Sequence, residues 1–169
     1  MAWVFGYGSL VAGGAVPCSL PGRRRHWGVA MDNRVDLPAY KHFLDASGHR
    51  PAVYVCFLDL RHDPGGSVNG AAVAVEDAAL PELDARERNY ERVDITGELD
   101  LDGRVYTYVG SEAGRRRLRE GLAAGTARIS RQYAEAVEAG FRALGQEPAY
   151  LASTDPDPCE RADLRVVYD

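Results

Sequence analysis

One glutamate in the middle of the chain, Glu87, has the surroundings that a proton-transfer group requires. The sequence predicts a helix from Pro81 to about Arg92, because proline suits the first position of a helix. One face of this helix carries Leu80, Leu83, Glu87 and Tyr90. A carboxylate in an otherwise apolar stripe is directed toward the core, where desolvation raises its pKa. We therefore take Glu87 as a candidate acid/base, with a hydrogen-bonded structural glutamate as the alternative.

The two acids that precede Glu87 differ from it in their helical neighbours. Glu82 has Arg86 four residues on, a spacing that favours an ion pair on a helix surface. Asp84 has Arg88 at the same spacing, whereas Glu87 has no cation four residues away in either direction. This contrast predicts solvated surface acids beside one inward carboxylate.

A glycine-bracketed loop near the N-terminus is the second candidate for chemistry. Residues 3–5 are apolar and aromatic and predict a buried strand, which is followed by Gly6, Tyr7, Gly8 and Ser9. Glycine permits unusual backbone angles and lets a ligand approach the main chain, and successive N–H groups in such a loop can bind an anion. The serine adds a hydroxyl, but no nucleophile-elbow motif surrounds it. The alternative is a tight turn that only ends the strand.

The remaining segments predict the strands and helices that would position these two candidates. Further strands are expected at residues 26–31, 52–58, 68–75, 104–109 and 164–168, and helices at 112–125 and 130–144. Tyr106 and Tyr108 would share one face of the strand at 104–109. Irregular structure is expected at 11–22, a long loop at 32–50 and a tight turn at 63–66. The arginines at 23–25 are interpreted as a solvated edge.

Length and composition favour one soluble domain that comprises residues 1–169. The chain has 169 residues, 46% of them hydrophobic and 27% charged, with a net charge of −5. This charge gives no support for binding nucleic acid or an acidic membrane surface. The three cysteines predict free thiols, and with no leader or long apolar run we expect a cytoplasmic protein. The four histidines lack metal-ligand spacing, so no metal and no cofactor is expected.

Two sequence segments resemble the signatures of a known family. The first is Val4-Phe5-Gly6-Tyr7-Gly8-Ser9-Leu10, and the second is Leu83-Asp84-Ala85-Arg86-Glu87. Both are similar, in order and position, to the motifs of the gamma-glutamylcyclotransferase family, whose members release 5-oxoproline from gamma-glutamyl compounds. The resemblance implies an α+β fold in which helices flank a small mixed barrel-like sheet.

The resemblance also implies roles for particular residues. Glu87 would be the catalytic acid/base, and the substrate would be held by Tyr7, Gly8, Ser9 and Leu10. Family members place a tyrosine near the acid, for which Tyr106 and Tyr108 are the candidates. The expected partner is a small-molecule gamma-glutamyl substrate whose amine portion stays open: an amino acid, a glutathione-like peptide, a polyamine or another amine. The segment at 32–50 is a candidate for setting that choice, and no oligomeric state is predicted.

Two other functions compete with this interpretation. A non-catalytic domain of the same fold would bind a small carboxylate ligand, but binding alone does not require an inward acid. An arginine-driven nucleic-acid binder would use residues 23–25 and 115–119. The negative net charge and the lack of interleaved aromatic and basic residues disfavour it.

Overall fold

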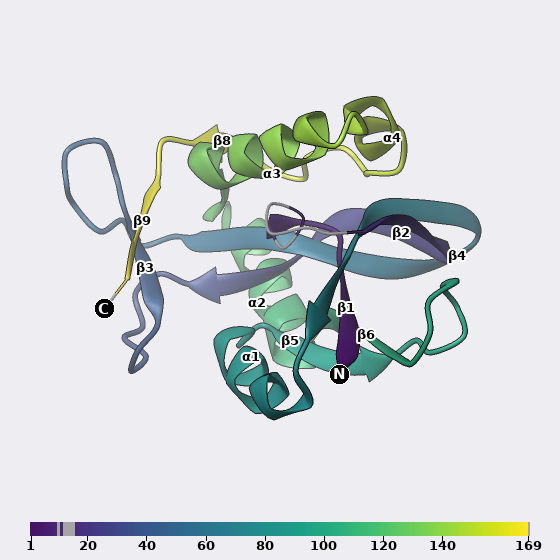
Figure 1. Cartoon of the computed structure of the whole chain (residues 1–169). Helices are drawn as coiled ribbons and strands as arrows, with labels where there is room; N and C mark the ends of the chain where they lie inside the picture. The colour runs from purple at the N-terminus through teal and green to yellow at the C-terminus, as the bar shows by residue number, and fades with distance from the viewer. Residues whose placement is uncertain (10, 12–15, 169) are drawn as a thin grey trace.

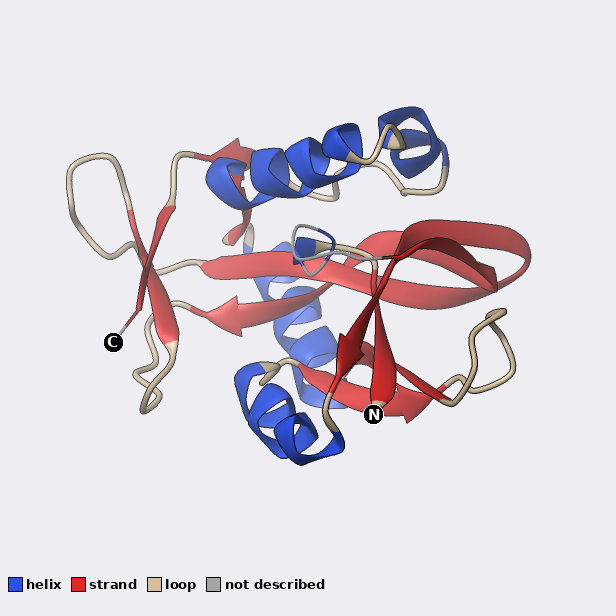
Figure 2. Ribbon diagram, viewed as in Figure 1, coloured by secondary structure: helices blue, strands red, loops and turns tan. Residues whose placement is uncertain are grey.

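The computed structural model describes residues 1–9, 11 and 16–168 and shows an α+β fold. A strongly twisted mixed sheet forms the centre, with α3 and α4 on one side and α1 beside the other end (Figures 1 and 2). Within the described residues the main sheet has seven strands in the order β5-β6-β1-β4-β7-β8, with β2 paired to β4. The predicted fold class is therefore confirmed.

The strands of the main sheet are β1 (Ala2–Gly6), β2 (Val16–Asp32), β4 (Tyr54–Val75), β5 (Tyr90–Asp94), β6 (Arg104–Gly110), β7 (Ala127–Ser130) and β8 (Arg161–Ala162). The first strand lies between an antiparallel neighbour, β4, and a parallel neighbour, β6. Strands with neighbours on both sides are buried and apolar, and Val4 and Phe5 are 2% and 0% exposed. The loop that follows β1 therefore starts from the interior of the sheet.

The long β2–β4 ribbon differs from the prediction in two places. Residues expected to be irregular belong to β2 from Val16 onward, and the expected turn at 63–66 lies within β4. The pairing passes from Arg23↔His62 to Pro21↔Ser67, so the single residue Gly22 faces four residues of β4. Gly22 has φ +75°. The glycines and proline at 63–66 thus form a bulge in a continuous ribbon rather than a hairpin turn.

Glycine is required where β1 and β4 approach each other most closely. A Cβ atom on Gly70 would lie 2.2 Å from the carbonyl oxygen of Gly6, a distance that real Cβ contacts do not reach. The small residues expected to leave room for a neighbouring backbone do so here. This contact places the end of β1, and with it the glycine loop, against β4.

The helices are η2 (Asp77–Ala79), α1 (Leu80–Arg86), α2 (Glu112–Ala124), α3 (Arg131–Ala143) and α4 (Glu147–Ala152). The predictions for α2 and α3 are confirmed. Ser111 and Ser130 cap their N-termini through side-chain oxygens, and Gly125 caps α2 with a left-handed conformation. No helix among the described residues has the length and apolar content needed to span a membrane.

The helix that carries the candidate acid is shorter than predicted. It ends at Arg86, Glu87 is its C-cap residue, and Tyr90 already belongs to β5. Residues 90–94 instead form an antiparallel ladder with β6, from Tyr90↔Gly110 to Asp94↔Tyr106. Because tertiary hydrogen bonding overrides a weak helical preference, the chain leaves the helix directly before Glu87.

A small second sheet lies in the segment predicted to be one long loop. Strand β3 (Lys41–Leu44) pairs antiparallel with β9 (Arg165–Tyr168), which confirms the closing strand near the C-terminus. Asn33 supports this segment, because its side chain donates to Phe43 O at 3.0 Å and accepts from Phe43 N at 2.9 Å. The expected loop is therefore wrong for residues 41–44.

The interpretation of residues 23–25 as a solvated edge is wrong for Arg25. This side chain is 0% exposed and belongs to the core. Its guanidinium lies 4.8 Å from the centre of the Phe141 ring and 4.6 Å from that of Tyr150. The register of β2 directs Arg25 into the layer between the sheet and helices α3 and α4, which a run of three arginines does not reveal.

Candidate active site

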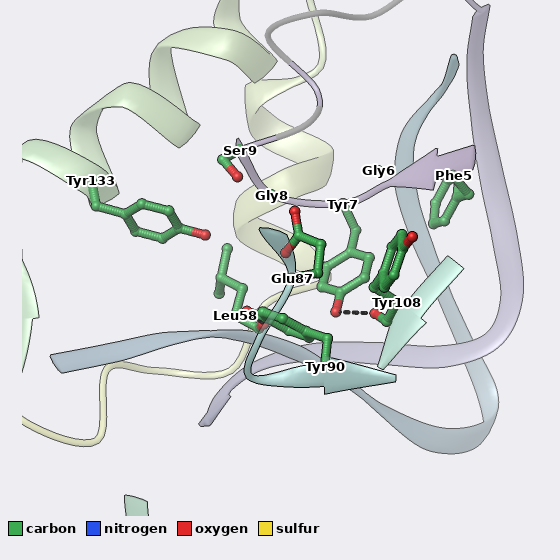
Figure 3. Close-up of a pocket in the computed structure, with 10 residues that line it drawn as sticks. All are labelled: Phe5, Gly6, Tyr7, Gly8, Ser9, Leu58, Glu87, Tyr90, Tyr108 and Tyr133. Atoms are coloured by element: carbon green, nitrogen blue, oxygen red, sulfur yellow. Dashed lines mark hydrogen bonds between the residues drawn. The ribbon is translucent and has the colours of Figure 1, made fainter. Parts of the chain in front are cut away.

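An inner cavity lies where β1 ends and α1 ends, and most of the candidate residues predicted from distant parts of the sequence line it. Figure 3 shows its lining, which comprises Phe5, Gly6, Tyr7, Gly8, Ser9, Leu58, Glu87, Tyr90, Tyr108 and Tyr133. The structure thus brings Glu87 together with the glycine loop. Leu10, the fourth predicted residue of that loop, lies outside the described residues.

The Glu87 side chain is half-buried, and its carboxylate points toward the loop of Gly8 and Ser9 (Figure 3). Burial raises the pKa of Glu87, and the positive charges of Lys41 and Arg86 oppose part of that rise. No described residue donates a hydrogen bond to this carboxylate. A half-buried carboxylate without a donor in the described part of the chain is open to a ligand or to water.

Asp84 anchors α1, the helix whose C-cap residue is Glu87. It accepts a hydrogen bond from the Tyr108 hydroxyl at 2.7 Å and pairs with Arg92 at 3.3 Å. The predicted surface pairing with Arg88 is not what the structure shows, since Arg88 donates to Pro38 O. Asp84 therefore ties α1 to β5 and β6, and this fixes where Glu87 emerges.

The backbone of the loop is held from both sides. Arg25 Nε donates to Tyr7 O at 2.7 Å, and the Tyr7 hydroxyl donates to Tyr108 O at 2.6 Å. Burial raises the pKa of Tyr7 well above its ordinary value, so its hydroxyl stays protonated. Within the described part of the chain, the amide of Gly8 donates to no acceptor. A fixed loop with a free N–H group suits the binding of an anion.

Gly8 leaves room beside the main chain, and its backbone angles are ordinary. Neither Gly6 nor Gly8 has a positive φ, so the unusual angles expected of them are absent. A Cβ atom on Gly8 would lie 3.4 Å from Leu58 Cδ1 and 3.4 Å from the Tyr133 hydroxyl oxygen. A larger residue would thus fill the space that a ligand needs beside the main chain.

The two predicted tyrosines lie in different places. Tyr108 lines the inner cavity, but Tyr106 does not, and its ring instead packs against the Arg92 guanidinium at 4.8 Å. The sequence reasoning missed Tyr90 and Tyr133 as lining residues. Tyr90 was assigned to the apolar face of the helix, and Tyr133 to the buried face of α3, so both were taken for core.

Tyr133 differs from the other lining tyrosines in where its hydroxyl lies. The hydroxyl of Tyr90 donates to Leu58 O at 2.6 Å, as those of Tyr7 and Tyr108 donate elsewhere in the protein. The Tyr133 hydroxyl points into the cavity, toward Ser9 and Glu87 (Figure 3). Burial raises the pKa of Tyr133 and the Glu87 charge adds to that rise, while hydrogen bonding with Ser9 opposes part of it. Tyr133 thus presents a neutral hydroxyl to the cavity, next to Ser9.

A second, larger cavity of about 360 Å³ continues from the inner one. We call it the outer cavity. The two share Ser9, Glu87, Tyr90 and Tyr133 as lining residues. Glu87 therefore lies at their junction. Elsewhere, no group of three or more His, Cys, Asp or Glu side chains among the described residues is arranged to hold a metal ion.

Comparison with known proteins identifies the family. Over residues 4–123 the chain matches the family described as gamma-glutamyl cyclotransferase, AIG2-like. The chain belongs to that family. The match spans both sequence signatures, so the predicted resemblance is confirmed. A search of curated proteins finds no match.

Solved structures agree with this assignment at the level of the fold. A protein described as gamma-glutamyl cyclotransferase has a TM-score of 0.54 at 12% identity, over 92% of this chain and 88% of that one. A human protein described as uncharacterized has a TM-score of 0.54 at 13% identity, with the same coverage. YkqA from Bacillus subtilis has a TM-score of 0.50 at 15% identity, over 92% of this chain and 56% of that one.

Proposed function

We propose that this member of the family is a cyclotransferase that releases 5-oxoproline from a gamma-glutamyl amine or peptide. The observation that carries the proposal is the Glu87 carboxylate. It has a raised pKa, no hydrogen-bond donor among the described residues, and a position facing the glycine loop at the junction of two cavities. A structural glutamate would have donors around it.

In the proposed reaction the substrate supplies its own nucleophile. The α-amine attacks the γ-carbonyl carbon, a new C–N bond closes the five-membered ring, and the bond to the leaving nitrogen breaks. Ring closure within one molecule has a high effective molarity, so the enzyme has to orient the groups rather than supply a nucleophile. No water is consumed, and the products are 5-oxoproline and the free amine.

The protons move through Glu87. Its carboxylate takes a proton from the α-ammonium group of the substrate and then gives a proton to the leaving nitrogen. An α-amino group has a pKa of about 8, far above that of an ordinary carboxylate. A raised pKa of Glu87 narrows this gap and makes the first proton transfer easier, while the protonated carboxyl stays acidic enough to protonate the leaving nitrogen.

The loop would hold the charged end of the substrate. The free Gly8 amide is available for the α-carboxylate or for the oxyanion that forms at the γ-carbonyl, and the Ser9 hydroxyl lies beside it, next to the Tyr133 hydroxyl. Leu10 keeps this role only by the family resemblance. Tyr108 lines the same cavity, and Tyr133 offers its hydroxyl from the opposite side.

A panel of gamma-glutamyl compounds tests the proposal directly. Each compound is incubated with the protein, and 5-oxoproline and the released amine are quantified by mass spectrometry. We expect both products in equal amounts from at least one compound. Binding without release would instead favour a non-catalytic domain that holds a small carboxylate ligand, and it would contradict the proposal.

The rate should depend on pH through Glu87. Burial raises the pKa of this group, and only its ionised form accepts the proton, so kcat/KM should rise with pH through that pKa. The midpoint should lie above 4.5, the ordinary value for a glutamate. A pH–rate profile checks this. An acidic limb centred at or below 4.5 would show that the ionisation of Glu87 in this environment does not control the rate.

A further inference from the structure

Two of the three cysteines face each other away from the candidate active site. Cys56 lies on β4 and Cys159 in the segment between α4 and β8, 103 residues apart in the sequence. Their sulfur atoms are 3.7 Å apart, and both residues are free thiols joined by a hydrogen bond. Neither cysteine is part of the described lining of the inner or the outer cavity, so the proposed cyclotransferase chemistry makes no use of this pair.

The two thiols differ in their exposure to solvent. Cys56 is 0% exposed and belongs to the apolar core. The hydrogen bond with Cys159 and burial both raise the pKa of Cys56, so this thiol keeps its proton. Cys159 is half-buried and lines a surface cavity of about 340 Å³ beside Arg128. A small oxidant in water can therefore reach Cys159 but not Cys56.

The surroundings of Cys159 favour its thiolate form. The hydrogen bond with Cys56 lowers the pKa of Cys159, and the positive charge of Arg128 lowers it further. Burial and the charges of Asp157 and Glu160 oppose part of this effect, and Glu160 also pairs with Arg128 at 3.0 Å. Because the thiolate is the nucleophilic form of a cysteine, Cys159 is the more reactive member of the pair.

The segment that carries Cys159 is built to let the two sulfur atoms approach. It is anchored on either side by backbone hydrogen bonds of Asp155 and Glu160. Between these anchors, residues 156–158 are exposed and belong to no helix or strand. A disulfide requires a sulfur–sulfur distance of roughly 2 Å, which a local shift of this segment would supply while β4 stays in place.

We propose that Cys159 is a site of oxidation by hydroperoxides and that Cys56 resolves the product to an intramolecular disulfide. In the first step the Cys159 thiolate attacks one oxygen atom of hydrogen peroxide, the O–O bond breaks, and a sulfenic acid and a hydroxide ion form. In the second step the Cys56 sulfur attacks the sulfenic sulfur, the S–O bond breaks, and the departing hydroxyl group leaves as water with the Cys56 proton. The pair loses two electrons, which the peroxide gains.

The disulfide would join the segment after α4 to the strand with the most neighbours. β4 pairs with β1, β2 and β7, so Cys56 is fixed in the middle of the main sheet. A cross-link between positions 103 residues apart removes much of the entropy of the unfolded chain. The thermal midpoint of the oxidised protein should therefore rise by roughly 4–16 °C.

The test treats the protein with a small molar excess of hydrogen peroxide, blocks the remaining thiols by alkylation and maps the peptides without reduction. We expect a linked pair of peptides that contain Cys56 and Cys159, an intact mass lower by two hydrogen atoms, and loss of the link after a dithiol reductant is added. Linkage of a different pair, an unchanged mass, or oxidation of Cys159 to a sulfinic acid without linked peptides overturns the proposal.

Three single variants separate the roles of the cysteines. Cys56→Ala should stop at the sulfenic acid, which dimedone captures at Cys159. Cys159→Ser should form neither product. Cys18→Ser is the matched control, because Cys18 is also half-buried but burial raises its pKa, and this variant should link the pair as the unmodified protein does. If Cys56→Ala does not fold, the linked peptides of the unmodified protein and their loss in Cys159→Ser still decide.

Thermal unfolding with and without peroxide completes the test. The rise of the midpoint should occur in the unmodified protein and in Cys18→Ser, and it should be absent from Cys159→Ser. A midpoint that falls when the link forms would contradict the stabilising role of the disulfide. None of these measurements uses 5-oxoproline release, so this inference and the proposed function stand or fall separately.

Discussion

Glu87→Gln is expected to lower the rate of 5-oxoproline release by roughly 10²–10⁴-fold, the usual contribution of a positioned proton-transfer group. Glutamine keeps the volume of the side chain but removes the titrating proton. The carboxylate has no donor among the described residues that the amide would lose, so the fold should persist. Single-turnover release of 5-oxoproline and the thermal midpoint are measured on the same preparation.

The folding stability of Glu87→Gln gives an independent check, because the direction of its change follows from the raised pKa of Glu87. The folded-state pKa of Glu87 is raised, so the folded protein holds its proton more tightly than the unfolded chain. This group therefore lowers the stability of the unmodified protein as pH rises from the ordinary value of 4.5 through the raised pKa. Glu87→Gln should gain stability relative to the unmodified protein across that window.

Glu82→Gln is the control for both measurements. Glu82 is exposed on the same helix, and its substitution should change neither turnover nor thermal midpoint appreciably. A destabilised Glu87→Gln protein with near-normal turnover per folded molecule would contradict the mechanism. It would assign Glu87 a structural role instead, in which mismatched partners cost about 1–3 kcal/mol.

Arg25→Met is expected to cost about 3–5 kcal/mol of folding stability, because several buried acceptors lose their donor at about 1–3 kcal/mol each. The guanidinium donates to the carbonyls of Tyr7 and Asn69 and to the hydroxyls of Ser153 and Thr154. The thermal midpoint should fall by roughly 6–20 °C for a chain of this size. Thermal unfolding followed by circular dichroism measures it.

The neighbouring residue supplies the control. Arg24 is partly exposed and pairs with Asp155, so Arg24→Met should cost about 1 kcal/mol or less. Arg25→Met should also lower kcat/KM per folded molecule, since the Tyr7 carbonyl that Arg25 holds belongs to the loop proposed to bind the substrate. Equal losses of stability in the two variants would show that burial of Arg25 contributes nothing beyond a surface pair.

The sequence alone selected the candidate residues for the proposed chemistry. The glycines of the loop after β1 and the acid in an apolar stripe, Glu87, are local signals. Each is recognised from its neighbours in the sequence, independently of the tertiary structure. Ser130 as a helix cap and the apolar face of α3 were predicted for the same reason. Glu87 was selected even though its helix ends one residue earlier, since the apolar surroundings of its segment are retained.

Only the tertiary structure decided what surrounds these residues. The ladder between β5 and β6 ended α1 before Glu87 and moved Tyr90 onto a strand. The register of β2 turned Arg25 into the core, and the packing of α3 brought Tyr133 to the cavity. Lys41 reached the outer cavity because β3 pairs with a strand more than a hundred residues away. Such pairings depend on long-range hydrogen bonds and burial, which leave no periodic signal within one segment.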